Sequence, residues 1–171
     1  LSEANENTGG LLVPLVKILK SWKREKCDYV KSFHIELMAV KIFSDTTIES
    51  IPKGLLTFFE SAGSYFSEAC LKDPANSETL IDEYLDKDGT REQICAHIET
   101  EKDVAKAAVD AEENGNDDVA IKEWKKMFAE SKGQAASTAA GLAAPTIISN
   151  PAKPWASSEL SCHITDLLKK S

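Results

Sequence analysis

The chain has 171 residues, of which 42% are hydrophobic, and a formal net charge of -8 at pH 7. This length and composition are ordinary for one globular domain with its own core. No run of about 18 apolar residues and no secretion signal is present, so we expect no membrane span, no secretion and a cytoplasmic location. Because the chain begins at Leu1 and not at methionine, we interpret it as a fragment of a longer protein.

The first predicted helix runs from about Leu11 to Lys26, after a polar segment, residues 1–10, that we interpret as a lead-in from upstream sequence. Its apolar residues recur at the spacing of one helical face: Leu11, Leu15, Ile18 and Trp22. We therefore expect Trp22 to be a core residue. Three basic residues, Lys17, Lys20 and Arg24, fall on the opposite side of this helix.

The second predicted helix begins at Ser32, whose hydroxyl is a suitable N-cap. Its apolar residues go almost all round the helix: Phe33, Ile35, Leu37, Met38, Val40, Ile42 and Phe43. A helix that is apolar on all sides belongs at the centre of a bundle.

Three further helices are predicted downstream. The third begins after Ser50 and continues to about Cys70, and Asp73-Pro74 stops it. The fourth runs from Thr90, in a capping box with Gln93, to about Glu112. The fifth begins at Asn116 or Asp117 and turns its apolar residues inward: Ala120, Trp124, Met127 and Phe128.

Shorter features complete the prediction. A short helix is expected around Leu80 to Leu85, and no segment alternates long enough to be a convincing strand. Residues 131–157 are rich in Ala, Gly, Ser, Thr and Pro and are expected to form a flexible tail, whereas residues 158–171 can form a last amphipathic helix. The fold class is therefore an all-α bundle of about five main helices, in a domain spanning residues 11–130.

Charge is distributed unevenly along the chain. Residues 17–31 carry a local charge of +4, whereas residues 73–118 carry a local charge of -11. A chain this acidic is a poor general binder of nucleic acid, and the small basic patch suits a small phosphorylated ligand. The four cysteines form no Cys-x-x-Cys pair and the histidines form no metal-binding motif, so we expect free thiols and no metal site.

Several segments, taken in order, resemble a known family. They are Lys20-Ser21-Trp22, a break near Cys27 and Asp28, Ser32-Phe33-His34-Ile35-Glu36, Leu71-Lys72-Asp73-Pro74-Ala75, the Ala and acidic residues from Val104 to Glu113, and the segment from Ala120 to Phe128. Together they resemble the C-terminal helical domain of the second-messenger nucleotidyltransferases, the superfamily of oligoadenylate synthetase, cyclic GMP-AMP synthase and bacterial anti-phage relatives. The resemblance covers about residues 8–130.

The resemblance implies a nucleotide-binding role for two residues. In this family a lysine on the first helix and a serine opening the second hold the triphosphate, and the matching positions are Lys20 and Ser32. An ammonium group and a helix N-terminus both suit phosphate. Lys23, on a neighbouring face, is expected to contribute much less.

The resemblance also implies what this chain lacks. The family's catalytic carboxylates and the Mg²⁺ ions that they hold belong to an upstream catalytic domain, and we assign no catalytic or metal-binding residue here. The expected partners are nucleoside triphosphates, that upstream domain and, through the last helix, another protein. We expect no membrane partner and no extended nucleic-acid surface.

Two alternatives stay open. Arg91 and His97 match the loose Arg-x4-6-His pattern of helical HEPN-type ribonucleases, although acidic residues surround them and would repel RNA. The chain could also be a helical protein-interaction module without a small ligand.

Overall fold

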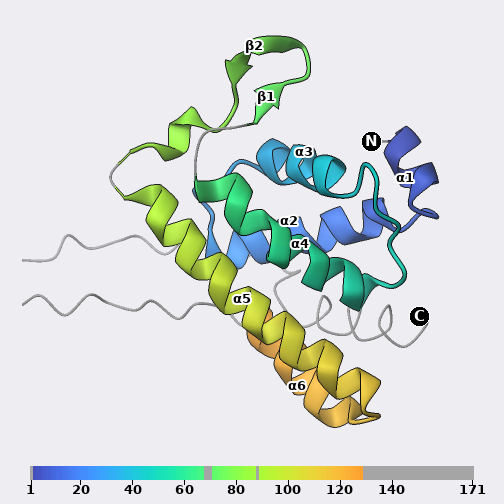
Figure 1. Cartoon of the computed structure of the whole chain (residues 1–171). Helices are drawn as coiled ribbons and strands as arrows, with labels where there is room; N and C mark the ends of the chain where they lie inside the picture. Colours follow the sequence, from blue (N-terminus) through green and yellow to red (C-terminus); the bar gives the residue numbers. More distant parts are fainter. Residues whose placement is uncertain (1, 68–70, 88, 129–171) are drawn as a thin grey trace, which may run out of the picture.

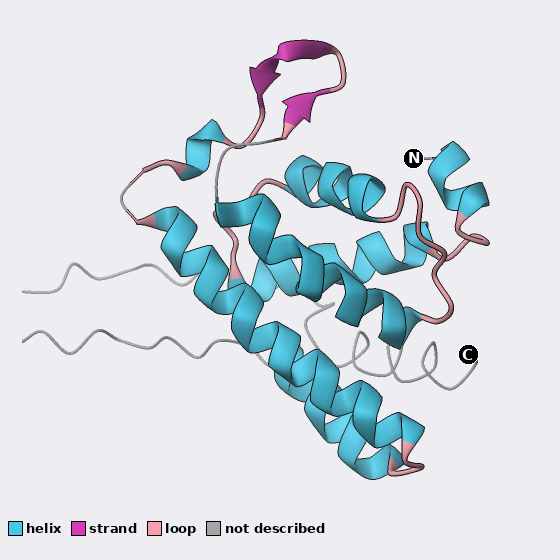
Figure 2. Ribbon diagram, viewed as in Figure 1, coloured by secondary structure: helices cyan, strands magenta, loops and turns pink. Residues whose placement is uncertain are grey.

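The computed structural model describes residues 2–67, 71–87 and 89–128, and helices dominate these ranges (Figures 1 and 2). In chain order the elements are α1 (Ser2–Asn7), α2 (Leu12–Lys26), α3 (Ser32–Ile42), α4 (Ile51–Ser67), β1 (Lys72–Asp73), β2 (Asn76–Leu80), the 3-10 helix η1 (Glu83–Leu85), α5 (Thr90–Glu113) and α6 (Asp117–Met127). The predicted all-α bundle of five main helices is confirmed, since α2 to α6 match the five predicted segments.

Helix α4 lies at the centre of the bundle, where it contacts α2, α3 and α5 (Figure 1). Phe58, Phe59 and Phe66 of α4 are fully buried, and the ring of Trp22 from α2 packs edge to face on Phe59 with centroids 5.0 Å apart. The core position predicted for Trp22 is thus confirmed. The central position predicted for α3 is wrong, because Phe33 is 51% exposed and α3 buries only one side.

Two predicted side-chain caps are not formed. Helix α3 begins at Ser32 itself, so Lys31 is the capping residue, and no side chain caps the helix. Helix α5 begins at Thr90, after Gly89 with a φ of 72°, and the Thr90 hydroxyl donates to a backbone carbonyl in the preceding turn. Both helices still begin within one residue of the prediction, because a cap residue and the first helical residue are adjacent in the chain.

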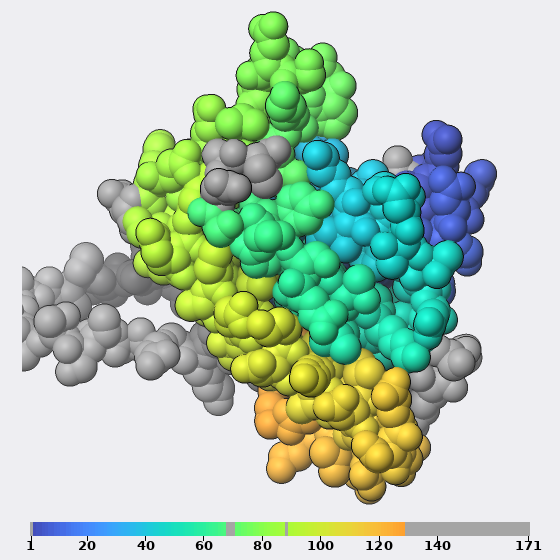
Figure 3. Space-filling model, viewed as in Figure 1, coloured from blue at the N-terminus to red at the C-terminus, as the bar shows by residue number. Residues whose placement is uncertain are grey.

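Residues 71–87 contain a feature that the sequence interpretation missed. Strands β1 and β2 form an antiparallel hairpin, in which Lys72 lies opposite Leu80, and η1 replaces the short helix predicted nearby. The hairpin stands out from the body of the molecule (Figure 3). Because β1 has only two residues and β2 is almost entirely exposed, neither strand needs the alternating pattern by which strands are recognised.

Helices α5 and α6 form a helical hairpin that extends below the other helices in Figure 1. The turn between them uses Gly115, whose φ of 69° suits glycine. Trp124 of α6 is buried, as predicted, and its indole N–H donates to Glu112 Oε1 of α5 at 2.7 Å. This bond joins the two helices near the turn.

The predicted domain, residues 11–130, corresponds to α2 to α6 as far as residue 128. The predicted lead-in, residues 1–10, contains α1, whose Asn5 side chain accepts a hydrogen bond from the Val13 N–H at 2.8 Å. The tail (131–157) and the last helix (158–171) fall outside the described residues. No helix within the described ranges has both the length and the apolar character needed to cross a membrane.

Candidate functional site

Lys20 and Ser32, the two residues expected to bind phosphate, line one surface cavity of about 340 Å³. Lys20 belongs to α2 and Ser32 is the first residue of α3. The cavity's remaining lining residues come from α2 and from the turn that follows it: Lys17, Ser21, Lys23, Arg24 and Asp28. Four cationic side chains therefore border a space large enough for several phosphate groups.

The fold of α2 and the following turn explains this arrangement. The apolar stripe of α2 is fully buried at Leu12, Leu15, Leu19 and Trp22. The basic residues on the other side therefore remain accessible. Helix α2 ends where the Cys27 N–H donates to the Lys23 carbonyl at 2.8 Å, and the Val30 N–H then donates to the Cys27 carbonyl at 2.9 Å. Since Cys27 and Val30 are fully buried, this tight turn brings Ser32 back beside α2.

The first turn of α3 offers hydrogen-bond donors at the cavity. The Lys31 N–H donates to the hydroxyl oxygen of Tyr84 at 2.9 Å, and the His34 N–H donates to the Lys31 carbonyl. No hydrogen bond within the described residues uses the N–H of Ser32 or of Phe33. These two amides and the exposed Ser32 hydroxyl are therefore available to an anion at a helix N-terminus.

Three of the four cations at the cavity already contact a carboxylate. Lys20 forms an ion pair with Glu36 of α3. The Lys23 ammonium lies 3.3 Å from Asp28, and the Arg24 guanidinium lies 3.3 Å from Glu25. The positive field in the cavity is therefore weaker than the number of basic residues suggests.

Lys23 is more buried than its expected place on a neighbouring face of α2 suggests. We expected it to lie on a neighbouring face with little role, but its side chain is only 11% exposed and lines the same cavity. Position 23 follows Leu19 by four residues, so it lies beside the buried stripe, and the long apolar stem of lysine can be buried there. Lys23 is therefore a lining residue of the cavity, and its substitution would disturb packing as well as charge.

Behind the cavity, the first turn of α3 is fixed by η1. The His34 ring is 1% exposed, and its Nδ1 lies 3.0 Å from the Tyr84 hydroxyl. Burial lowers the pKa of His34 to about 4, so the ring is neutral at pH 7. The Lys31 ammonium lies 4.3 Å from the centre of the Tyr84 ring. Tyr84 thus contacts both Lys31 and His34, and Ser32 lies between these two residues in the chain.

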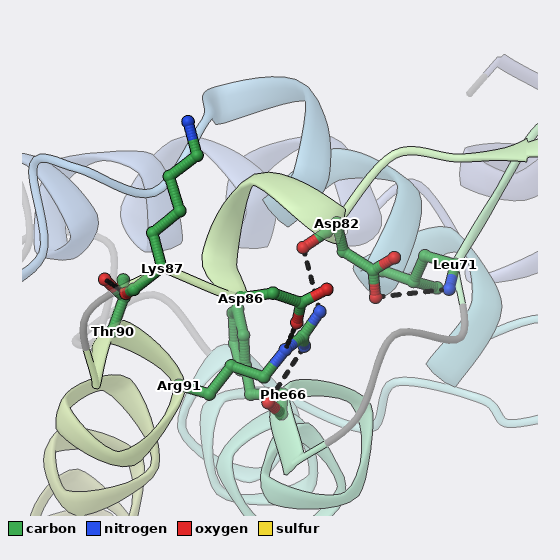
Figure 4. A network of polar contacts seen from close by, with 7 residues as sticks. All are labelled: Phe66, Leu71, Asp82, Asp86, Lys87, Thr90 and Arg91. Atoms are coloured by element: carbon green, nitrogen blue, oxygen red, sulfur yellow. Dashed lines mark hydrogen bonds and ion pairs between the residues drawn. The ribbon is translucent and has the colours of Figure 1, made fainter.

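Arg91 is the centre of a second polar network, shown in Figure 4. Its guanidinium forms an ion pair with Asp86 and donates to the backbone carbonyls of Phe66 at 3.2 Å and Asp82 at 2.9 Å. Asp82 is buried and accepts a hydrogen bond from the Leu71 N–H. Arg91 therefore joins the end of α4, the start of α5 and the segment that carries η1.

The geometry of Arg91 favours a structural role over a ribonuclease site. Its side chain is 11% exposed and its donors contact protein acceptors. His97 lies six residues further along α5, and at about 100° per residue the two side chains point about 120° apart around the helix axis. The structure does not bring Arg91 and His97 to one face of α5.

Within the described ranges, no group of three or more His, Cys, Asp or Glu side chains could hold a metal ion. Cys27 and Cys95 are free thiols, as predicted, and Cys70 and Cys162 lie outside the described residues. Burial raises the pKa of Cys27 to about 12, so this thiol is protonated and unreactive as a nucleophile at pH 7.

No family model, curated protein or solved structure matches the chain. The resemblance to the second-messenger nucleotidyltransferases therefore rests on the sequence segments described above.

Sequence reasoning missed Glu36 and Asp28, the carboxylates that contact Lys20 and Lys23. Glu36 lies four residues after Ser32, which places it on the same face of α3. The sequence shows this spacing. It does not show the contact between Glu36 and Lys20, since no spacing rule relates residues on two different helices.

Proposed function

We propose that the cavity binds the phosphate chain of a nucleoside triphosphate, and that the chain is the nucleotide-binding helical domain of a nucleotidyltransferase that makes cyclic or linear oligonucleotide second messengers. One observation carries the proposal. The two residues that the family resemblance assigns to phosphate, Lys20 and Ser32, line the same cavity with three further cations.

Each group has a distinct role in this proposal. Lys20, with a side chain 37% exposed, supplies a mobile ammonium with three donors. Ser32 supplies a hydroxyl and, with Phe33, the free amides at the positive end of α3. Lys17 and Arg24 add charge at the exposed rim. Phosphate oxygens are strong acceptors for all these donors.

An exposed aromatic residue favours a nucleotide over inorganic phosphate as the ligand. Phe33 follows Ser32 directly and is 51% exposed, although a phenyl ring in a helical bundle is usually buried. The ring does not itself line the cavity, but its place next to Ser32 in the chain offers an exposed surface on which a base can stack. Tyr29, in the turn before α3, is a second exposed ring, at 41%.

The catalytic step is assigned to another part of the proposed enzyme. In the resembled family, Mg²⁺ ions neutralise charge on the transferring phosphate and are held by an upstream domain. The carboxylates described in this chain do not gather in a group that fits such ions. The role of the present residues is to bind and orient the triphosphate.

The test is a titration of the chain with ATP and GTP. Lys20→Ala should weaken triphosphate binding about tenfold or more, since a charge-assisted contact contributes about 1.5 to 3 kcal/mol. The free energy of unfolding should change by about 0.5 kcal/mol or less, because Lys20 is a partly exposed helical residue. Calorimetric titrations and thermal melts measure the two quantities.

Lys41→Ala is the control, because Lys41 is an exposed lysine at the other end of α3 and does not line the cavity. It removes the same charge and should leave affinity within about twofold of wild type. Equal affinities of wild type and Lys20→Ala would contradict the proposal. Absence of nucleotide binding by the wild-type chain would favour the interaction module.

A further inference from the structure

Glu36 occupies an unusual position for a residue near an anion site. Its carboxylate forms an ion pair with Lys20, although the proposed ligand of that lysine is itself negatively charged. Glu36 and Ser32 are four residues apart and lie on one face of α3, so the carboxylate is one helical turn from the cavity. A residue that served only to bind phosphate would not carry this charge.

The ion pair between Glu36 and Lys20 is accessible to solvent. The two side chains are 30% and 37% exposed, and the lysine reaches the carboxylate from a different helix. Such a pair is weak, since water and salt screen it and two long side chains must be ordered. A phosphate group can therefore displace the carboxylate from the ammonium at small cost.

We propose that Glu36 is an internal counterion of the cavity, which occupies the Lys20 ammonium in the empty state and competes with the ligand's phosphate for it. This inference rests on the proposed function. The competition lowers the affinity of the site in two ways. The ligand must first displace the Glu36 carboxylate from the Lys20 ammonium. The displaced carboxylate then remains nearby and repels the phosphates. Glu36 thereby limits the lifetime of the bound state and favours release.

Charge repulsion has a signature that other mechanisms lack. The repulsion grows with the charge of the ligand, so Glu36 weakens the binding of ATP more than that of AMP. It also decreases as salt screens the charges. The competition acts through one lysine, so this part of the effect disappears when Lys20 is replaced, whereas the direct repulsion between Glu36 and the phosphates remains.

A different role for Glu36 would have the opposite effect. If the carboxylate served to hold Lys20 in the correct place for phosphate, its removal would weaken binding, because the lysine would lose its orientation. The sign of the change in affinity therefore distinguishes a competitor from a positioning residue.

The experiment is a calorimetric titration of the full chain and its variants with ATP and with AMP. Glu36→Gln keeps the shape of the side chain and removes its charge, and it should strengthen ATP binding about two- to fivefold. The gain should be smaller for AMP and smaller at high salt. When Lys20→Ala is already present, Glu36→Gln should give less than half of the gain in ATP affinity that it gives in the wild-type chain. A double-mutant cycle measures this difference.

Glu49→Gln is the matched control, since Glu49 also pairs with a lysine, Lys53, but neither residue lines the cavity. It should leave the affinity for ATP unchanged. Unchanged or weaker ATP binding by Glu36→Gln, together with a loss on Lys20→Ala, would overturn this inference and leave the proposed function intact. If the wild-type chain and Glu36→Gln both fail to bind ATP, the proposed function and the inference are both overturned.

Discussion

Glu101 is a carboxylate in the core, with 4% of its surface exposed on helix α5. Burial raises its pKa from 4.5 to about 7, and the nearby Lys26 ammonium and the Trp22 indole lower it again only in part. Glu101 Oε2 and Trp22 Nε1 have no hydrogen-bond partner among the described residues, so the indole approaches the carboxyl without reaching hydrogen-bond geometry. A carboxyl in these surroundings is more stable when protonated.

Stability should therefore depend on pH through this group. Because the pKa of Glu101 is higher in the folded state, its contribution to stability is fully present below about pH 4.5 and is lost as the pH rises through about 7. Glu101→Gln removes the ionisation, so relative to wild type the variant should gain about 1 to 3 kcal/mol between pH 5 and pH 8. Urea unfolding at the two pH values measures the difference.

Glu99→Gln is the control for this prediction, since Glu99 is an exposed residue on the same helix and contacts Lys102. The stability of this variant relative to wild type should not increase with pH. A constant difference between Glu101→Gln and wild type across the same range would show that the Glu101 carboxyl does not titrate there.

The residues of the candidate site differ in how far the sequence could predict them. Lys20 and Ser32 come from one continuous stretch and were selected by the family resemblance, since helix periodicity alone does not separate Lys20 from Lys17 and Arg24. The burial of Trp22 followed from the same stripe. The partners Glu36 and Tyr84 could not be predicted, because each reaches the site from another element through a contact that only the fold creates.

At the level of elements, the helices were predictable and the hairpin was not. Helices α2 and α5 begin and end within about one residue of the prediction, and α6 begins where predicted, because their apolar stripes are long and Asn114-Gly115 ends α5. The position of α3 was predicted, but its place in the bundle was wrong. Composition alone cannot show which side of an apolar helix remains uncovered, and α3 leaves Phe33 exposed.

Helix α4 contains two glycines in contrasting surroundings. A Cβ atom added at Gly63 would meet only Ile98 Cγ2, at 4.0 Å, whereas one added at Gly54 would lie 3.0 Å from Ile48 Cγ2 and 3.2 Å from Leu15 Cδ2. Gly54 thus allows the close approach of α2 and of the loop before α4. Gly63 has no such packing role.

Gly63→Ala should therefore stabilise the protein by about 0.5 to 1 kcal/mol, because alanine loses less backbone entropy than glycine in a helix. Gly54→Ala makes the same chemical change in the same helix, but it should lower the melting temperature, since Leu15 and Ile48 must shift to accommodate the methyl group. Thermal melts of the two variants show whether each substitution raises or lowers the melting temperature. Stabilisation of equal size by both would show that Gly54 is not required for packing.

At the level of the whole molecule, charge separates the candidate site from the rest of the surface. The local charge of +4 in residues 17–31 is confined to α2 and the turn to α3, and residues 73–118, with a local charge of -11, form the hairpin, η1, α5 and the start of α6. The value of +4 already includes Glu25 and Asp28, and Glu36 of α3 neutralises the basic region further through its ion pair with Lys20. The part of this surface that belongs to the described residues can attract a compact anion but offers no long basic track.

The chain should therefore bind ATP but not duplex RNA or DNA at about 0.15 M salt. Duplex binding depends on neutralising many phosphates, and an overall charge of -8 would repel the backbone beyond the cavity. Fluorescence anisotropy with labelled duplexes, beside ATP titration, measures both affinities.

The same experiment tests the ribonuclease alternative, which requires that RNA approach Arg91 and His97 among acidic residues of α5. Saturable duplex RNA binding that weakens steeply with salt, or RNA cleavage that Arg91→Lys and His97→Ala both abolish, would contradict the prediction and favour a nucleic-acid enzyme.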